Sequence, residues 1–233
     1  MADLASGAVW GALGAIIVAN ILLSGDNAVV IAMAARSLPP SQQKKAVFWG
    51  SAAAIVLRVV LTLVAVSLLT VPFLKIIGAI LLFWIGVQLM LDSAEEGEVR
   101  AHGTLAGAVR TILVADLVMS TDNVIAVAGA ADRAPEEWRM TLIAIGLATS
   151  IPLIIAGSQL LMKVMDRFPV IITLGAALLG FLAGGMFVTD PWWAAWFKAN
   201  LPDAEVLFGS ACAVGVVIIG KWIQRRAGSA EAR

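Results

Sequence analysis

The chain has little of several residue types that common classes of protein require. Among its 233 residues there are one cysteine and one histidine, which excludes an internal disulfide and a cluster of thiolate metal ligands. The formal net charge is zero and no run of Lys or Arg exceeds two residues, which argues against a nucleic-acid partner. Charged residues make up only 14% of the chain, well below the roughly one quarter typical of soluble domains.

Hydrophobic residues, by contrast, make up 61% of the chain, and the mean hydropathy is +0.95. Because about 20 helical residues cross the hydrocarbon core of a bilayer, this composition predicts an all-α membrane protein with one transmembrane domain over residues 1–233. Pro152 falls inside the fifth expected helix and predicts a kink there. The seven expected spans are residues 8–34, 46–70, 72–91, 105–131, 139–162, 169–188 and 205–224.

The distribution of Lys and Arg predicts how the chain crosses the membrane. Cytoplasmic loops of membrane proteins carry an excess of these residues. With the amino terminus outside, the cytoplasmic segments hold ten of them and the external segments three, so we expect the carboxyl terminus in the cytoplasm. No Lys or Arg precedes the first apolar stretch, so a cleavable signal peptide is not expected. The ten are Arg36, Lys44, Lys45, Arg100, Lys163, Arg167, Lys221, Arg225, Arg226 and Arg233, and the three are Arg133, Arg139 and Lys198.

Two segments of the chain are near copies of each other. Residues 18–35, VANILLSGDNAVVIAMAA, align with residues 114–131, VADLVMSTDNVIAVAGAA, at an offset of 96, and Gly50 aligns with Gly146 at the same offset. Three spans separate the copies, so they must cross the membrane in opposite directions. This predicts an inverted repeat of three plus three helices, a plan that many transporters use to place a substrate site near the midplane. The expected units are repeat 1 at 8–91, repeat 2 at 105–188 and a seventh helix at 205–224.

Each copy places a carboxylate and an amide inside its apolar stretch. An ionised carboxylate in hydrocarbon is costly unless it faces a cavity, a partner or an ion, so Asp26 and Asp122 mark a candidate site. Hydrogen bonding between helices is the alternative role. An all-oxygen set of ligands suits hard divalent cations such as Mn²⁺, Mg²⁺ or Ca²⁺ better than zinc or copper. The neighbouring side chains that offer oxygen are Asn20, Ser24, Asn27, Asp116, Ser120 and Asn123.

Convergence of these side chains requires the helices to bend. We expect each helix to kink or unwind, near Ser24–Gly25 in the first copy and Ser120–Thr121 in the second, and glycine makes this easier in the first.

Three further side chains have more than one interpretation. Met119 and Met33 could add a thioether ligand that favours Mn²⁺, or they could pack in the core. Arg58 lies within the second span, where it could compensate the carboxylates or release a bound metal, or it could extend to the membrane interface.

Two peripheral segments differ in composition from the spans. The acidic segment Asp92–Gly103 predicts a solvated cytoplasmic connector, with a metal-sensing loop as the alternative. The segment 191–203 concentrates tryptophan in a stretch too short to cross the bilayer, which predicts an external helix at the membrane interface.

The two copies are similar in sequence to the TerC family of integral membrane proteins. The resemblance rests on LLSGDNAVVIAMAARSLP near the amino terminus and on DLVMSTDNVIAVAGAA in the fourth span. It implies a location in the bacterial inner membrane and a role in Mn²⁺ efflux or tellurite resistance. It also implies an acidic metal site at Asp26 and Asp122. The residues around that site would be Asn20, Asn27, Asp116 and Asn123.

These observations predict a secondary transporter that exports a divalent cation, Mn²⁺ best, in exchange for protons. Lipids and the metal are the expected partners, no prosthetic group is expected, and a homo-oligomer is compatible with the sequence. One alternative keeps the transporter but changes the substrate to Ca²⁺, Mg²⁺ or a small organic solute. A membrane scaffold is a second, although the short loops offer little surface. An intramembrane enzyme is a third, and the absence of a recognisable nucleophile and base argues against it.

Overall fold

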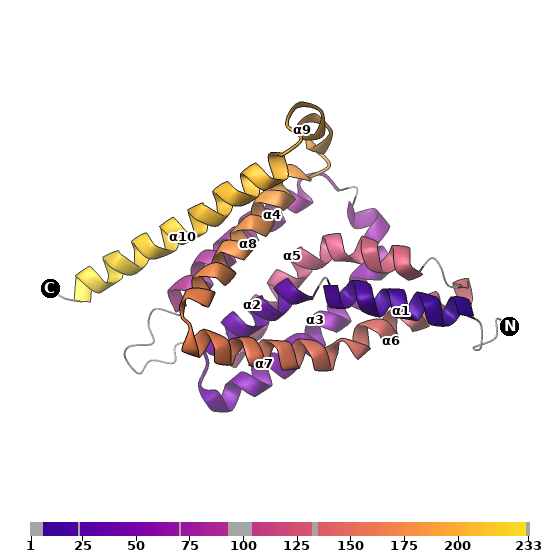
Figure 1. Cartoon of the computed structure of the whole chain (residues 1–233), viewed down its shortest axis with the longest axis horizontal. Helices are drawn as coiled ribbons and strands as arrows, with labels where there is room; N and C mark the ends of the chain where they lie inside the picture. Colours follow the sequence, from indigo (N-terminus) through magenta and orange to yellow (C-terminus); the bar gives the residue numbers. More distant parts are fainter. Residues whose placement is uncertain (1–6, 23, 70, 93–103, 132–134, 232–233) are drawn as a thin grey trace.

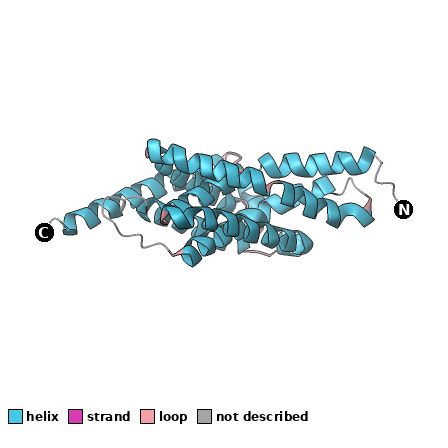
Figure 2. Ribbon diagram, turned by 90° about the horizontal axis from the view of Figure 1, so that it is seen from below, coloured by secondary structure: helices cyan, strands magenta, loops and turns pink. Residues whose placement is uncertain are grey.

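The computed structural model describes residues 7–22, 24–69, 71–92, 104–131 and 135–231. All regular elements in this part of the chain are helices, as both views show (Figure 1 and Figure 2). For some residues inside helices, Asn20 and Asp122 among them, the description covers the backbone alone. The prediction of an all-helical protein is therefore confirmed.

The helices follow the expected spans closely, with most ends within two residues. The largest differences are at the end of α10, which reaches Glu231 rather than residue 224, and at the start of α3. Helix α3 begins at Pro40 rather than at residue 46, because proline is favoured in the first turn. The bounds are α1 Gly7–Leu22, α2 Gly25–Arg36, α3 Pro40–Leu69, α4 Leu74–Asp92, α5 Leu105–Ala131, α6 Glu136–Thr149, α7 Ile151–Arg167, α8 Val170–Val188, α9 Ala194–Asn200 and α10 Ala204–Glu231.

Five helical segments of the described chain are long and apolar enough to cross a membrane, and they include α6 and α7 as one unit. The shorter apolar helix Val9–Ala19 accompanies them. The expected span 8–34 is not among the five, because it is divided into the two shorter helices α1 and α2. The expected span 105–131 is not among them either. The five are Pro40–Thr62, Leu74–Asp92, Glu136–Arg167, Val170–Val188 and Ala204–Arg226.

Two of the expected spans are broken, at Ser24 and at Ser150. The first break separates α1 from α2 and lies where the Ser24–Gly25 sequence predicts it. The second separates α6 from α7, two residues before Pro152, because proline cannot donate the backbone hydrogen bond that continues a helix. The unwinding expected at Ser120–Thr121 is wrong, because α5 is continuous there, and a kink at this point stays a prediction. Threonine lacks the backbone freedom that glycine gives the first copy.

The helices of the two expected repeats pack against each other in matched pairs. Helices α1 and α2 lie along α6 and α7, α3 packs on α5, and α4 packs on α8 (Figure 1). Two close contacts reproduce this pattern at the offset of 96. A Cβ atom added to Gly50 would lie 2.6 Å from Cδ1 of Ile112, and one added to Gly146 would lie 2.5 Å from Cγ2 of Ile16. Each glycine therefore admits the isoleucine of the opposite segment.

The closest helix pair is α8 with α10, which run side by side (Figure 1). Gly180 and Gly184 are four residues apart on α8 and face the backbone of α10. A Cβ atom at Gly180 would lie 2.7 Å from the carbonyl oxygen of Cys212, and one at Gly184 would overlap the carbonyl group of Phe208. Small residues four apart allow such close approach of helices in membranes.

The corner between α8 and α9 carries a buried carboxylate, Asp190. Its Oδ1 accepts hydrogen bonds from the backbone N–H of Phe73, at 3.1 Å, and of Trp192, at 2.9 Å. Phe73 has a φ of 68°, which is strained for a bulky residue, and its ring packs on Trp192 with 4.8 Å between centroids. Asp190 thus joins the loop before α4 to the aromatic segment. Trp192 and Trp196 are exposed, as expected for the interfacial stretch 191–203.

We expect Asp190→Ala to lower the free energy of unfolding by about 1–3 kcal/mol, because it removes the acceptor of two partly buried backbone hydrogen bonds. The loss of a buried carboxylate whose Oδ2 has no partner among the described residues offsets part of this cost. Thermal unfolding of the protein in detergent measures the change. Asp203→Ala, at an exposed position, is the control, and equal melting temperatures for the two variants would contradict the assignment.

Candidate functional site

The first acidic residue of the candidate site lies where the broken helix resumes. Asp26 is in the first turn of α2, and its Oδ1 accepts a hydrogen bond of 2.8 Å from the backbone N–H of Asn27. The amino-terminal end of a helix stabilises a negative charge, so the break at Ser24 gives this carboxylate a favourable backbone environment. Asp26 is partly exposed, whereas Asn27 and Ser24 are buried. A partly exposed carboxylate at a helix start is accessible to a cation.

The second acidic residue, Asp116, is held by an arginine from another helix. The guanidinium of Arg58, on α3, forms a buried ion pair with Asp116, on α5, through Nη2 and Oδ1. Nε of Arg58 also donates to Oγ of Ser120 at 3.0 Å, and that hydroxyl donates to Oδ2 of Asp116 at 3.0 Å. Both carboxylate oxygens therefore have a donor. Arg58 is only 2% exposed, so its alternative role at the membrane interface is excluded.

The ion pair and Asp26 belong to one electrostatic neighbourhood. The charges of Arg58, on α3, and of Asp116, on α5, both act on the carboxylate of Asp26, on α2. Helix α2 packs on both α3 and α5. Asn123, one further residue of the second copy, is also buried on α5. The structure thus gathers Asp26, Arg58 and Asp116 from three helices.

For two predicted site residues the structure describes the backbone and not the side chain. Asn20 is near the end of α1 and Asp122 is in the middle of α5, but their side chains are not among those described. Within the described side chains, no group of three acidic, histidine or cysteine residues could hold a metal ion. The predicted metal site at Asp26 and Asp122 therefore stays a prediction. The acidic residues 93–103 also lie outside the described residues.

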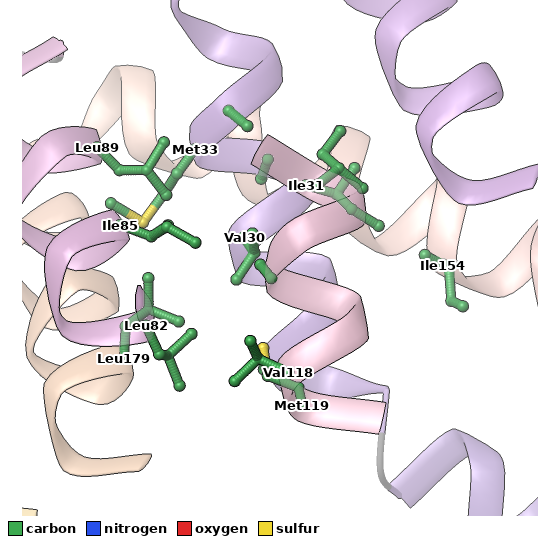
Figure 3. Close-up of a cluster of buried hydrophobic side chains, with 14 of the residues drawn as sticks. Val30, Ile31, Met33, Leu82, Ile85, Leu89, Val118, Met119, Ile154 and Leu179 are labelled. Carbon is green, nitrogen blue, oxygen red and sulfur yellow. The ribbon is translucent and has the colours of Figure 1, made fainter. Parts of the chain in front are cut away.

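The two methionines near the site are buried in the hydrophobic core. Met33 lies beside Ile85 and Leu89 (Figure 3), and its sulfur faces Gly175 of α8, where an added Cβ would be 2.9 Å away. Met119 belongs to the same core cluster. Both side chains pack between helices, which is the simpler of the two interpretations.

Sequence reasoning did not single out two buried hydroxyls on α3 and α7. Ser51 is 1% exposed and Ser158 is 0% exposed, and their Oγ atoms have no hydrogen-bond partner in the part of the chain described. Ser51 is seven residues before Arg58, so both occupy the same face of α3. This spacing was visible in the sequence, but a single serine in an apolar helix is a weak signal.

Comparison with known proteins places the chain among bacterial membrane proteins. It is 43% identical over 171 residues to "Uncharacterized membrane protein YjbE" of Bacillus subtilis (strain 168), covering 73% of this chain and 76% of that protein. It is 26% identical over 184 residues to "Uncharacterized membrane protein YceF" of the same organism, covering 75% and 69%. It is 27% identical over 156 residues to "UPF0053 inner membrane protein YgdQ" of Escherichia coli (strain K12), covering 59% and 66%.

The family comparison covers nearly the whole chain. No solved structure matches the chain. The model of the "Integral membrane protein TerC family" matches residues 5–228, which include both Asp-Asn segments and every helix from α1 to α9 in full. The chain therefore belongs to the TerC family of integral membrane proteins.

Proposed function

We propose that this protein is a secondary transporter that exports divalent cations in exchange for protons and transports Mn²⁺ in preference to other cations. The single observation that carries the proposal is the arrangement of Asp26 at a helix break beside a buried Arg58–Asp116 pair, between the two related halves of the chain. Charged groups inside a membrane protein are rare and mark ion pathways.

Matched helix ends and contacts support an inverted repeat. The bounds of α4, Leu74–Asp92, and of α8, Val170–Val188, differ by 96 residues at both ends. The Gly50–Ile112 contact and the Gly146–Ile16 contact are related by the same offset. The first helix of each half packs on the second helix of the other, and the third helices pack together. A pseudo-two-fold axis generates this pattern, and substrate sites of such transporters lie between the halves.

The chemistry of the side chains supports a hard cation as the transported substrate. Asp26 and Asp122 are the proposed charged ligands, and the amide oxygens of Asn27 and Asn123 are the proposed neutral ones. All are oxygen donors, which Mn²⁺, Mg²⁺ and Ca²⁺ prefer. Carboxylates that release a metal in a membrane must take up another cation, so proton exchange is the simplest form of coupling. The amino terminus is proposed to lie outside the cell, because this arrangement leaves most Lys and Arg in the cytoplasm.

Metal flux into liposomes containing the purified protein tests the proposal. We expect uptake of Mn²⁺ that depends on a pH gradient and exceeds uptake of Mg²⁺ and Ca²⁺ at least about tenfold, since a discrimination of that size requires about 1.4 kcal/mol. Protein-free liposomes are the control.

Other outcomes of this assay decide between the alternatives. Greater uptake of Ca²⁺ or Mg²⁺ would keep the transporter and change its substrate. Binding of an organic solute in the presence of a chelator would exclude a metal substrate. No movement of any of the three cations would contradict the proposal and favour the scaffold.

A further inference from the structure

The Arg58–Asp116 pair joins the two halves of the molecule, and the symmetry-related positions hold no second ion pair. At the offset of 96, Arg58 corresponds to Ile154 and Asp116 corresponds to Asn20, whereas Ser120 corresponds to Ser24. Ile154 is buried in the hydrophobic core of α7. The first half therefore provides a cation and an amide where the second provides an apolar residue and a carboxylate.

The pair is also placed to act on the neighbouring carboxylate. Arg58 is 2% exposed, so little water screens its charge, and Asp26 interacts electrostatically with both members of the pair. An arginine keeps its charge at any physiological pH. The two oxygens of Asp116 are occupied by Nη2 of Arg58 and Oγ of Ser120, so in this conformation neither points freely toward a metal.

We propose that Arg58 and Asp116 determine the affinity of the cation site without ligating the metal. Arg58 repels the cation and favours its release, and Asp116 reduces this repulsion by pairing with Arg58. The inference rests on the proposed transport of a divalent cation by Asp26. It assigns to Asp116 a role different from that of a third metal ligand.

Opposite effects of two single substitutions test this assignment in the Mn²⁺ flux assay. Because a buried unit charge acts strongly over a few ångströms, we expect Arg58→Met to lower KM for Mn²⁺ at least about tenfold and to slow the maximal rate. Asp116→Asn, which removes the negative charge paired with Arg58, should raise KM at least about tenfold. The control is Arg110→Met at an exposed position of α5, which should leave both constants unchanged.

The double variant Arg58→Met with Asp116→Asn is the decisive measurement. It removes one charge of each sign, so KM should return to within about threefold of the wild-type value. A single substitution leaves one buried charge without its ion-pair partner, which can prevent folding. The double variant avoids this, so its KM decides the question where a single variant does not fold. A KM raised more than about tenfold in the double variant would show that Asp116 ligates the metal, and would overturn the inference.

The remaining outcomes separate the inference from the proposed function. If the single variants lower the maximal rate but leave KM unchanged, the pair is merely structural and the inference is wrong, while transport by the wild-type protein stands. If the wild-type protein moves no Mn²⁺, Mg²⁺ or Ca²⁺ in the same liposomes, the proposed function fails first and the inference falls with it.

Discussion

Asp26→Asn should reduce Mn²⁺ flux by about 100-fold or more, because even residues that only support a metal ligand typically contribute about 10–100-fold. The substitution keeps the shape of the side chain and an oxygen that can accept the hydrogen bond from the N–H of Asn27. It removes the negative charge that the start of α2 stabilises and that attracts the cation. The initial rate of Mn²⁺ uptake into liposomes, at equal amounts of protein, is the measurement.

The control for this substitution is an aspartate outside the site. Asp203 lies exposed before α10, and Asp203→Asn should transport at the wild-type rate. In cells that lack the protein and accumulate manganese, Asp26→Asn should fail to restore efflux, and Asp203→Asn should restore it. Wild-type flux by Asp26→Asn at equal expression would exclude Asp26 as a ligand.

Gly184→Ala is expected to destabilise the packing of α8 on α10. The added methyl group would overlap the carbonyl group of Phe208 and lie 2.5 Å from the backbone nitrogen of Gly209. Both are backbone atoms, so no side-chain rotation relieves the overlap and the helices must separate. Overpacking of this kind costs about 1–3 kcal/mol and occasionally more. Thermal unfolding in detergent should show the loss.

Gly185, the next residue of the same helix, is a closely matched control. A Cβ atom there would have nothing within 4 Å. Since alanine stabilises a helix relative to glycine by up to about 1 kcal/mol, Gly185→Ala should be neutral or stabilising. The two variants have the same composition and differ only in the face of α8 that carries the methyl group. Equal loss of stability in both would contradict the assignment of the effect to the contact between Gly184 and α10.

Much of the helix arrangement was predictable from local sequence. The expected spans 72–91 and 169–188 agree with α4 and α8 to within two residues, because long apolar runs bounded by proline leave little choice of helix end. The break at Ser24–Gly25 follows from glycine in the same way. The continuity of α5 through Ser120 was not predicted, because the repeat suggested that both copies bend alike.

The candidate site was predictable as a set of residues and not as a set of contacts. The sequence identifies Asp26, Asp116 and Arg58 as charges in apolar stretches. That Arg58 pairs with Asp116, 58 residues away, depends on how α3 packs against α5, which no local pattern specifies. The asymmetry of the two copies, Asn20 opposite Asp116, was visible in the sequence, but its meaning required the partner.

Both helix breaks lie in helices that pack on each other, because α1 and α2 run along α6 and α7. Helices α3 and α5, by contrast, have no comparable interruption. A helix bends most easily where its hydrogen-bond ladder is interrupted. One side of the molecule is therefore compliant and the other stiff. Asp26 begins the segment after a break, and Asp116 lies on the stiff side. We therefore expect the separation between these two carboxylates to change when the molecule flexes.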